Sequence, residues 1–276
     1  MNQILIRSDG SKNIGMGHIN RCYILASYLK KKYKLKPILL TKDNLSTREF
    51  LSNKKNSLKT IHFNSDLFYD QEIELIINLI SINNIKLLFL DLLVVEDESI
   101  YLELIKKIKI PICIISDDSN YHEFPVNLII NANPNQIEDN YLKLKNKYLI
   151  GPKYFIMDEY YSKMIPNSSD NFTVLVSLGG TDHNDIIFFI LKSLIKSKYF
   201  EKIIVISSKS SGYSEKLENF SLLTKDTKIE IYFDVESLST YWQKCGLAIT
   251  AGGNTLFERI ASGTPGASIC QLNRQM

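Results

Sequence analysis

Cysteine is scarce in this sequence, with four residues in 276. None forms a Cys-x-x-Cys pair, which argues against a structural zinc site and favours reduced, buried thiols at Cys22, Cys113, Cys245 and Cys270. No apolar run reaches the roughly 18–20 residues that a membrane-spanning helix needs, so we expect no membrane partner. The N-terminus also lacks a basic segment ahead of an apolar stretch, and the sequence therefore predicts a cytoplasmic protein.

A large excess of charge of one sign is also missing. The formal net charge is +3, and the lysines are spread along the sequence, which argues against nucleic acid as a partner. The hydrophobic content of 45% and the charged content of 23% are typical of a folded globular protein. A chain of this length fits one large domain or two medium ones, because single cores stop growing near roughly 250–300 residues.

The chain is organised around a glycine-punctuated stretch near its N-terminus. A short apolar run at 4–6 enters this stretch, and apolar residues at helical spacing over 19–29 leave it. The pattern predicts a strand, a loop and a helix, as at the first turn of a nucleotide-binding α/β layer. Gly15 and Gly17 would let a ligand approach the backbone of the loop closely.

His18 falls at the predicted start of this helix, where the positive end of the helix dipole favours a neutral imidazole. A neutral histidine at the lip of a cleft is a candidate general base; alternatively, the ring donates to a loop carbonyl. Asp9, on the same loop, either fixes the imidazole tautomer, holds a water or forms an Asx-turn. Arg21 lies one turn beyond His18 and either faces the same cleft or is solvated.

Strands and helices alternate over the first half of the chain. Asp91 directly follows a continuous apolar run, as expected of a polar residue at the carboxyl end of a buried parallel strand. The alternation implies right-handed βαβ crossovers and a mostly parallel sheet. The expected strands are 38–40, 60–63, 87–90, 112–115 and 128–130, and the expected helices are 67–82 and 97–109.

Residues 135–170 break this rhythm with a composition typical of a linker. The alternation then restarts, with expected strands at 174–176, 203–206, 229–232 and 247–249. We therefore predict an α/β protein with two Rossmann-like domains, 1–150 and 151–276, and a cleft between them.

Two glycine pairs in the second half follow predicted strands. Gly179 and Gly180 would let a ligand lie against backbone amides. Gly252 and Gly253 precede a helix that begins with Asn254 and Thr255, and the free amides of a helix N-terminus suit a diphosphate. Glu258, one turn in, is placed to accept hydrogen bonds from ribose hydroxyls. The alternative is an ordinary N-cap turn with a solvated glutamate. No Walker-type lysine follows, so the stretch is not a P-loop.

These stretches together resemble one family of enzymes. The matching segments are Arg7-Ser8-Asp9 with 14–18 and Arg21, Asp117-Asp118, Gly151-Pro152, 177–182, and 251–255 through Glu258. Their order and content are similar to those of the UDP-sugar hydrolases of pseudaminic acid biosynthesis. These enzymes remove UDP from UDP-2,4-diacetamido-2,4,6-trideoxy-β-L-altropyranose, a step that belongs to flagellin glycosylation and polysaccharide biosynthesis.

The resemblance implies a GT-B arrangement, close to that of the transferase that adds N-acetylglucosamine in peptidoglycan synthesis. The C-terminal domain would hold UDP, and His18, assisted by Asp9, would activate a water that attacks the anomeric carbon with inversion. It implies no metal and no cofactor, a UDP-sugar as the only partner, and a monomer. The expected substrate contacts are Arg7, Ser8, Gly15, Gly17, Arg21, Gly179, Gly180, Gly252, Gly253, Asn254, Thr255, Glu258 and Gln275.

Two departures from the family pattern leave alternatives open. Leu92-Leu93 stands where family members carry His-Tyr or a similar pair, so the identity of the sugar stays open. The family pattern continues into a final helix after a substrate-facing glutamine, which Gln275 would match. A glycosyltransferase of the same fold and a non-catalytic subunit that binds a nucleotide-sugar are the competing functions.

Overall fold

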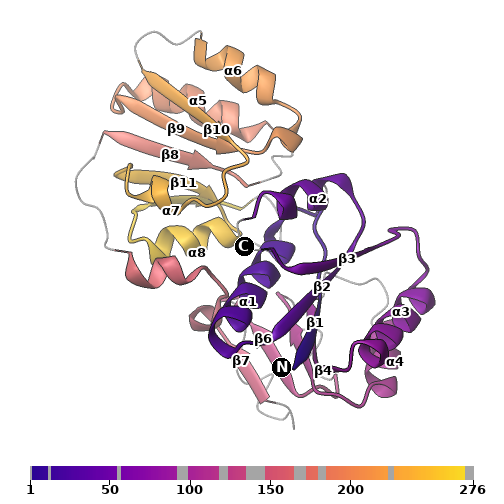
Figure 1. Cartoon of the computed structure of the whole chain (residues 1–276). Coiled ribbons are helices and arrows are strands. Elements are labelled where there is room, and N and C mark those ends of the chain that lie inside the picture. Colours follow the sequence, from indigo (N-terminus) through magenta and orange to yellow (C-terminus); the bar gives the residue numbers. More distant parts are fainter. Residues whose placement is uncertain are drawn as a thin grey trace. The chain divides into compact units, whose positions relative to one another are not determined.

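The computed structural model describes residues 2–11, 14–54, 57–91, 99–117, 124–134, 147–164, 172–179, 185–222 and 227–270. By its internal contacts the chain divides into two compact units, Met1–Ser11 with His18–Ile156 and Lys12–Gly17 with Met157–Met276. Each unit is built on one parallel sheet, which confirms the predicted pair of Rossmann-like α/β units (Figure 1). The cleft between 1–150 and 151–276 stays a prediction.

The first unit holds a seven-stranded sheet with the strand order β3-β2-β1-β4-β5-β6-β7. Every neighbouring pair is parallel, so each connection crosses from one end of the sheet to the other. Its elements are β1 (Gln3–Arg7), α1 (Gly17–Tyr33), β2 (Lys36–Lys42), α2 (Leu45–Ser52), β3 (Lys59–Phe63), α3 (Tyr69–Ile82), β4 (Ile85–Asp91), α4 (Ser99–Lys107), β5 (Ile112–Ile115), β6 (Leu128–Asn131), β7 (Lys147–Ile150) and the 3₁₀ turn η3 (Pro152–Tyr154).

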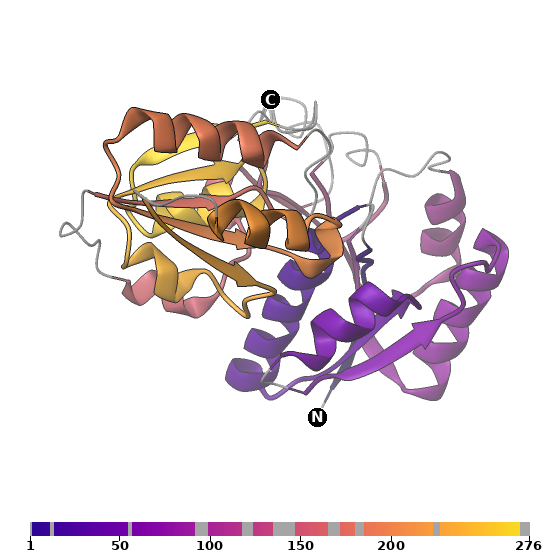
Figure 2. The ribbon, with the colours of Figure 1, turned by 90° about the horizontal axis from the view of Figure 1, so that it is seen from above.

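The central strands of this sheet are apolar on both faces because helices cover both. Leu5 and Leu88 pack in a core cluster with side chains of α3 and α4. Ile4 and Ile6, the neighbours of Leu5 along β1, point to the other face of the sheet and are equally buried. Figure 2 shows α1 on the opposite side of the sheet from α3 and α4. Continuous apolar runs, which predicted these strands, follow from burial on two sides.

The second unit holds a five-stranded sheet in the order β10-β9-β8-β11-β12, again with every pair parallel. This order repeats the pattern of the first sheet, in which the first strand lies inside the sheet and the order reverses beside it. Its elements are η4 (Glu159–Lys163), β8 (Thr173–Ser177), α5 (Ile186–Ser197), β9 (Lys202–Ser207), η5 (Lys209–Ser211), α6 (Ser214–Leu222), β10 (Lys228–Phe233), α7 (Ser239–Trp242), β11 (Leu247–Ala251), α8 (Asn254–Ala261) and β12 (Gly266–Ile269).

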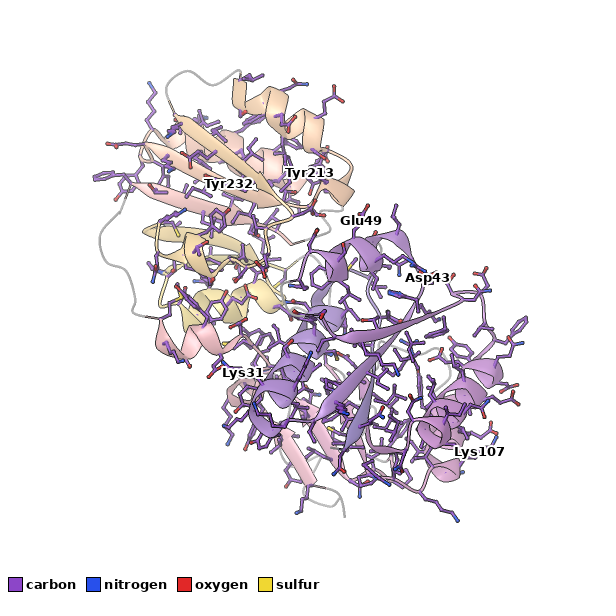
Figure 3. All side chains as sticks on the ribbon, in the orientation of Figure 1. Lys31, Asp43, Glu49, Lys107, Tyr213 and Tyr232 are labelled. Carbon is purple, nitrogen blue, oxygen red and sulfur yellow. The ribbon has the colours of Figure 1, made fainter. Side chains whose placement is uncertain are left out.

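Two core clusters fill the faces of the second sheet. On one face, Val174 packs in a cluster with residues of α5 and α6 and with Tyr213, which Figure 3 labels. On the other face, Leu175 packs with Trp242 and Tyr161. The indole Nε1 of Trp242 donates a hydrogen bond of 3.0 Å to the hydroxyl of Tyr161, so the buried ring has its polar group paired.

Three elements escaped sequence reasoning. The stretch 135–170 is not a linker throughout, because Lys147–Ile150 forms β7 and pairs with β6. Helix α2 has eight residues, too few for a clear period, and Asn44 caps it by accepting a 2.9 Å bond from the amide of Thr47. Strand β12 reads Gly-Ala-Ser-Ile and has no apolar run. Short elements of this kind depend on their neighbours in the sheet more than on their own composition.

The cysteines follow the prediction with one exception. All four are free thiols, and Cys22, Cys113 and Cys245 are buried. Cys270 is exposed, which corrects the expectation that every thiol is buried; it directly follows the edge strand β12, where fewer neighbours cover it. Among the described helices, none combines the length and the apolar character needed to cross a bilayer.

The buried Tyr161 hydroxyl gives a test of the second unit. Replacing Tyr161 with Phe removes the acceptor of the Trp242 N–H, and an unpaired buried donor costs about 1–3 kcal/mol. We expect the free energy of unfolding to fall by that amount. Trp242 is the only tryptophan in the chain, so its fluorescence during denaturant unfolding reports on this unit alone. Tyr160→Phe is the matched control, because Tyr160 is 42% exposed; equal losses in the two variants would contradict the assignment.

Candidate functional site

Polar side chains gather where the strand order of the first sheet reverses. The reversal lies between β1 and β4, which pair in parallel at the centre of the sheet. In open α/β sheets, ligands bind outside the carboxyl ends of the strands at this switch point. Strand β1 leads into α1 there, and β4 ends at Asp91. The fold thus directs attention to the residues that follow β1 and to Asp91.

His18 is the second residue of α1, as predicted, and its ring faces the end of β4. The Nδ1 atom lies 2.9 Å from Oδ1 of Asp91. The side chain of His18 is 9% exposed and that of Asp91 is fully buried. A carboxylate therefore holds the imidazole from the side of the sheet.

Arg21 lies one turn further along α1, so it shares a helix face with His18. Its Nε donates 2.7 Å to Oδ2 of Asp91, and its Nη2 donates 2.6 Å to Oδ1. The thiol of Cys22 also reaches Oδ2, at 3.2 Å. We call His18, Arg21, Cys22 and Asp91 the Asp91 cluster. Arg21 is buried and faces the same site as His18, so the solvated alternative does not hold.

Charge pairing decides the ionisation of the Asp91 cluster. Burial alone would raise the pKa of Asp91, but the guanidinium of Arg21 and the ring of His18 outweigh burial and hold that pKa well below its usual range. Burial likewise opposes the charge on Arg21, whereas Asp91 and Asp117 raise its pKa. Burial, followed by the Asp91 charge, raises the pKa of Cys22 well above normal. The cluster is thus a salt bridge beside a neutral thiol.

The neighbours of His18 assign its tautomer, since hydrogens follow from the hydrogen-bond network. Oδ1 of Asp91 is only an acceptor, so a bare Nδ1 at 2.9 Å would set two lone pairs against each other. A hydrogen on Nδ1 removes this repulsion. Arg21 Nη2, at 3.0 Å from Nδ1, then directs its hydrogen to Asp91. The Nε2 atom of the neutral ring keeps its lone pair, as a general base requires.

Asp117 follows β5 and contributes a second carboxylate. Arg21 Nη1 donates 2.6 Å to its Oδ1. Its Oδ2 lies 3.9 Å from Nε2 of His18, and its side chain is 42% exposed. One arginine thus joins the buried Asp91 to the accessible Asp117.

Arg7 and Asp9 form a separate network at the end of β1. Nε of Arg7 donates 2.7 Å to Glu72, and its Nη2 donates 2.7 Å to Asp9. The amide of Lys42 donates 2.8 Å to Oδ1 of Asp9. The carboxylate on the imidazole is that of Asp91, which corrects the expectation that Asp9 fixes the tautomer. Asp9 is engaged by the closest cation in its own segment, Arg7. A direct part for Asp9 in catalysis stays a prediction.

The remaining predicted residues near β1 differ in their exposure. Ser8 is completely buried, and its amide donates 3.1 Å to the carbonyl of Leu40. Gly15 has a φ of +79°, a left-handed conformation that favours glycine. Gly17 is the first residue of α1 and is half-buried. Substrate contacts from these residues stay predictions.

The second sheet also reverses its strand order, between β8 and β11, and the predicted glycines lie at its carboxyl ends. Gly179 follows β8 with a φ of +81°. Gly252 and Gly253 join β11 to α8, and the amide of Gly252 donates 3.1 Å to Ile269. Helix α8 starts at Asn254 without a side-chain cap from Gly253. Thr255, in the first turn of α8, is half-buried. The described residues do not include Gly180, Gln275, Asp118 or Leu92-Leu93.

Glu258 lies one turn into α8, as predicted, and is half-buried. Burial and the Glu258 carboxylate, through its charge and a hydrogen bond, raise the pKa of Tyr161. Glu258 therefore has a structural neighbour, so it is not simply a solvated glutamate. The ribose contact stays a prediction.

Sequence reasoning did not select Asp91, Asp117 or Glu72 as site residues. The signal for the first two was their position directly after apolar strands, because carboxyl ends of neighbouring parallel strands share one edge. Glu72 lies in the first turn of α3 and had no such signal. Within the described ranges, no group of three His, Cys, Asp or Glu side chains is arranged to hold a metal ion.

Comparison with known proteins gives distant relatives. No protein-family model matches the chain. An uncharacterised protein of Methanocaldococcus jannaschii is 27% identical in an alignment 282 residues long that covers 95% of this chain and 54% of that protein. The chain thus spans about half the length of this relative. The UDP-2,4-diacetamido-2,4,6-trideoxy-beta-L-altropyranose hydrolase of Campylobacter jejuni is 23% identical in an alignment 280 residues long that covers 99% of this chain and 93% of the hydrolase.

Among solved structures, that of MurG from Acinetobacter baumannii is similar to this chain. The superposition covers 99% of this chain and 80% of MurG. The TM-score is 0.65 and the sequence identity is 10%. At this identity the match describes the fold and not the activity. The chain has the α/β fold, with two parallel-sheet Rossmann-like units, of the GT-B glycosyltransferases.

Proposed function

We propose that the chain is a nucleotide-sugar hydrolase that releases UDP from a UDP-linked 2,4-diacetamido-2,4,6-trideoxyhexose, with the β-L-altro sugar of pseudaminic acid biosynthesis as the first candidate. The observation that carries the proposal is the ring of His18, held by the buried Asp91 at the switch point of the first sheet. The similarity to the Campylobacter jejuni hydrolase over nearly the whole chain supports the choice of substrate.

The chemistry follows from the tautomer of His18. Asp91 holds the hydrogen on Nδ1, so Nε2 takes a proton from a water molecule as the water oxygen attacks the anomeric carbon. The bond between that carbon and the diphosphate oxygen breaks, and its electron pair leaves with UDP. Attack from the face opposite UDP inverts the anomeric centre. The imidazolium that forms is stabilised by the charge of Asp91 across 2.9 Å.

The proposal assigns the nucleotide to the second unit. Gly179 and the pair Gly252-Gly253 follow β8 and β11, at the carboxyl ends of strands where ligands bind in α/β folds. The N-terminus of helix α8, where the helix dipole is positive, would stabilise the charge developing on the diphosphate. Glu258 would accept hydrogen bonds from the ribose.

The test is incubation of the full chain with a panel of UDP-linked diacetamido-trideoxyhexoses, following the release of UDP and free sugar. Free sugar without an added acceptor supports hydrolysis. Turnover only with an acceptor would identify a glycosyltransferase, the activity in the names of several proteins of this fold. Tight UDP binding without turnover would identify a binding subunit.

Replacing His18 with Asn removes the proposed base. We expect kcat to fall by about 10²–10⁴-fold, the contribution typical of general base catalysis. The Kd for UDP should stay within about twofold of the original value, because the nucleotide is assigned to the other unit. Steady-state kinetics and calorimetric titration with UDP measure the two quantities.

His62→Asn is the matched control, since His62 lies on β3 of the same unit and its nearest carboxylate, Asp43, is 3.9 Å away. We expect this control to keep its activity. Hydrolysis that survives in His18→Asn would show that another group is the base.

Replacing Asp91 with Asn removes the charge that holds the His18 tautomer and pairs with Arg21. We expect kcat to fall by about 10³–10⁴-fold, as when the carboxylate of a catalytic triad is neutralised, with KM nearly unchanged. The buried Arg21 also loses its main partner, so we expect a loss of stability of about 3 kcal/mol.

Glu72→Gln separates these two effects. Glu72 is another buried carboxylate of the same unit that pairs with an arginine, Arg7, and it is not a member of the Asp91 cluster. We expect similar destabilisation but a change in kcat of less than about tenfold. Assays well below the unfolding temperature, with folding checked by circular dichroism, compare the two variants. Equal loss of kcat in both would count against the positioning role of Asp91.

A further inference from the structure

Asp117 directs one carboxylate oxygen toward Nε2 of His18, and the chemistry above does not use this oxygen. Its Oδ2 lies 3.9 Å from His18 Nε2, whereas Asp91 occupies the opposite ring nitrogen, Nδ1. We propose that Asp117 Oδ2 and His18 Nε2 together hold the attacking water, with Asp117 as the second acceptor. This inference rests on the proposed hydrolysis.

The separation of the two atoms fits one bridging water. A distance of 3.9 Å is too long for a direct hydrogen bond between Oδ2 and Nε2. Two hydrogen bonds of about 2.8 Å span it with an angle of about 90° at the water oxygen, not far from the ~105° between its O–H bonds. Both neighbours are acceptors, so each takes one hydrogen of the water. The lone pairs of the water oxygen then point away from both groups and are available for attack.

Arg21 fixes one oxygen of the Asp117 carboxylate, and Asn133 holds the backbone of the same residue. Arg21 Nη1 donates a hydrogen bond of 2.6 Å to Oδ1 of Asp117, and Oδ2 is the oxygen on the side of His18. The side-chain amide of Asn133 donates 3.3 Å to the backbone carbonyl of Asp117. The side chain of Asp117 is 42% exposed and that of Asp91 is 0% exposed, so solvent reaches Asp117 and not Asp91. Arg21 thus holds one carboxylate for the ring and one for the water.

The reaction balances without a proton transfer to Asp117. As the water oxygen bonds to the anomeric carbon, one O–H bond breaks and its proton moves to His18 Nε2. The bond from that carbon to the diphosphate oxygen breaks, and UDP leaves with the electron pair. The second hydrogen stays on the new sugar hydroxyl and remains hydrogen-bonded to Asp117. The negative charge of Asp117 also favours the imidazolium that forms beside it.

The test is Asp117→Asn in the full chain, assayed for UDP release over a range of substrate concentrations. We expect kcat to fall by about 10–100-fold, because the water loses one of its two acceptors, while KM stays within about threefold. The split between kcat and KM is the readout, because a water that is poorly placed slows the reaction without weakening the binding of the substrate.

Asp117→Glu keeps the charge and moves the oxygen. Its kcat should lie between those of the unchanged protein and Asp117→Asn, with KM within about threefold of the original value. Glu103→Gln is the matched control: Glu103 is an exposed carboxylate of the same unit, paired on α4 with Lys107, which Figure 3 labels. We expect no change in this control.

The outcomes separate this inference from the proposed function. If the unchanged protein hydrolyses the UDP-sugar and His18→Asn does not, but Asp117→Asn keeps its kcat, the role of Asp117 is wrong and hydrolysis stands. A rise in KM as large as the fall in kcat would reduce Asp117 to a support of Arg21 and overturn the inference. If the unchanged protein releases no UDP, both fail together.

Discussion

Burying the carboxylate of Asp91 at the end of β4 costs several kcal/mol unless its oxygens are paired. Arg21 supplies two N–H groups, His18 one and Cys22 a thiol, so both oxygens are fully engaged. The same pairing that makes burial tolerable fixes the imidazole and directs Nε2 away from the sheet. Stability and site geometry therefore depend on one ion pair, and the variants that disturb it have to be judged on both.

The fold explains why these groups meet. His18 and Arg21 come from the helix after β1, Asp91 ends β4 and Asp117 follows β5, so residues up to 99 positions apart share one edge of the sheet. A parallel sheet brings together the carboxyl ends of all its strands, and the reversal of strand order at β1 and β4 leaves room there for a ligand. The second sheet repeats this order around β8 and β11, which places Gly179 and Gly252 at the equivalent point.

Most strands and the position of His18 were predicted from the sequence, and the exceptions have physical reasons. Buried strands such as 87–90 were predicted from continuous apolar runs, which are typical of strands covered on both faces. The loop before α1 indicated His18 because glycines and the start of a helix are local features of the sequence. The partner of His18 was misassigned: Asp9 is near it in sequence, whereas Asp91 is 73 positions away and meets it only through the pairing of β1 with β4. Strands β7 and β12 were missed because their identity comes from neighbouring strands.

The two carboxylates on Arg21 differ in a way that matters for chemistry. Asp91 has no access to solvent and four donors, so it can orient and stabilise charge but cannot reach a substrate. Asp117 accepts from Arg21 at Oδ1 and its side chain is 42% exposed, so it is placed to exchange partners in the proposed reaction. Both carboxylates are held by the same guanidinium, through Nη2 and Nε to Asp91 and through Nη1 to Asp117. The proposed position of the water therefore depends on the pairing of the buried Asp91 as much as on Asp117 itself.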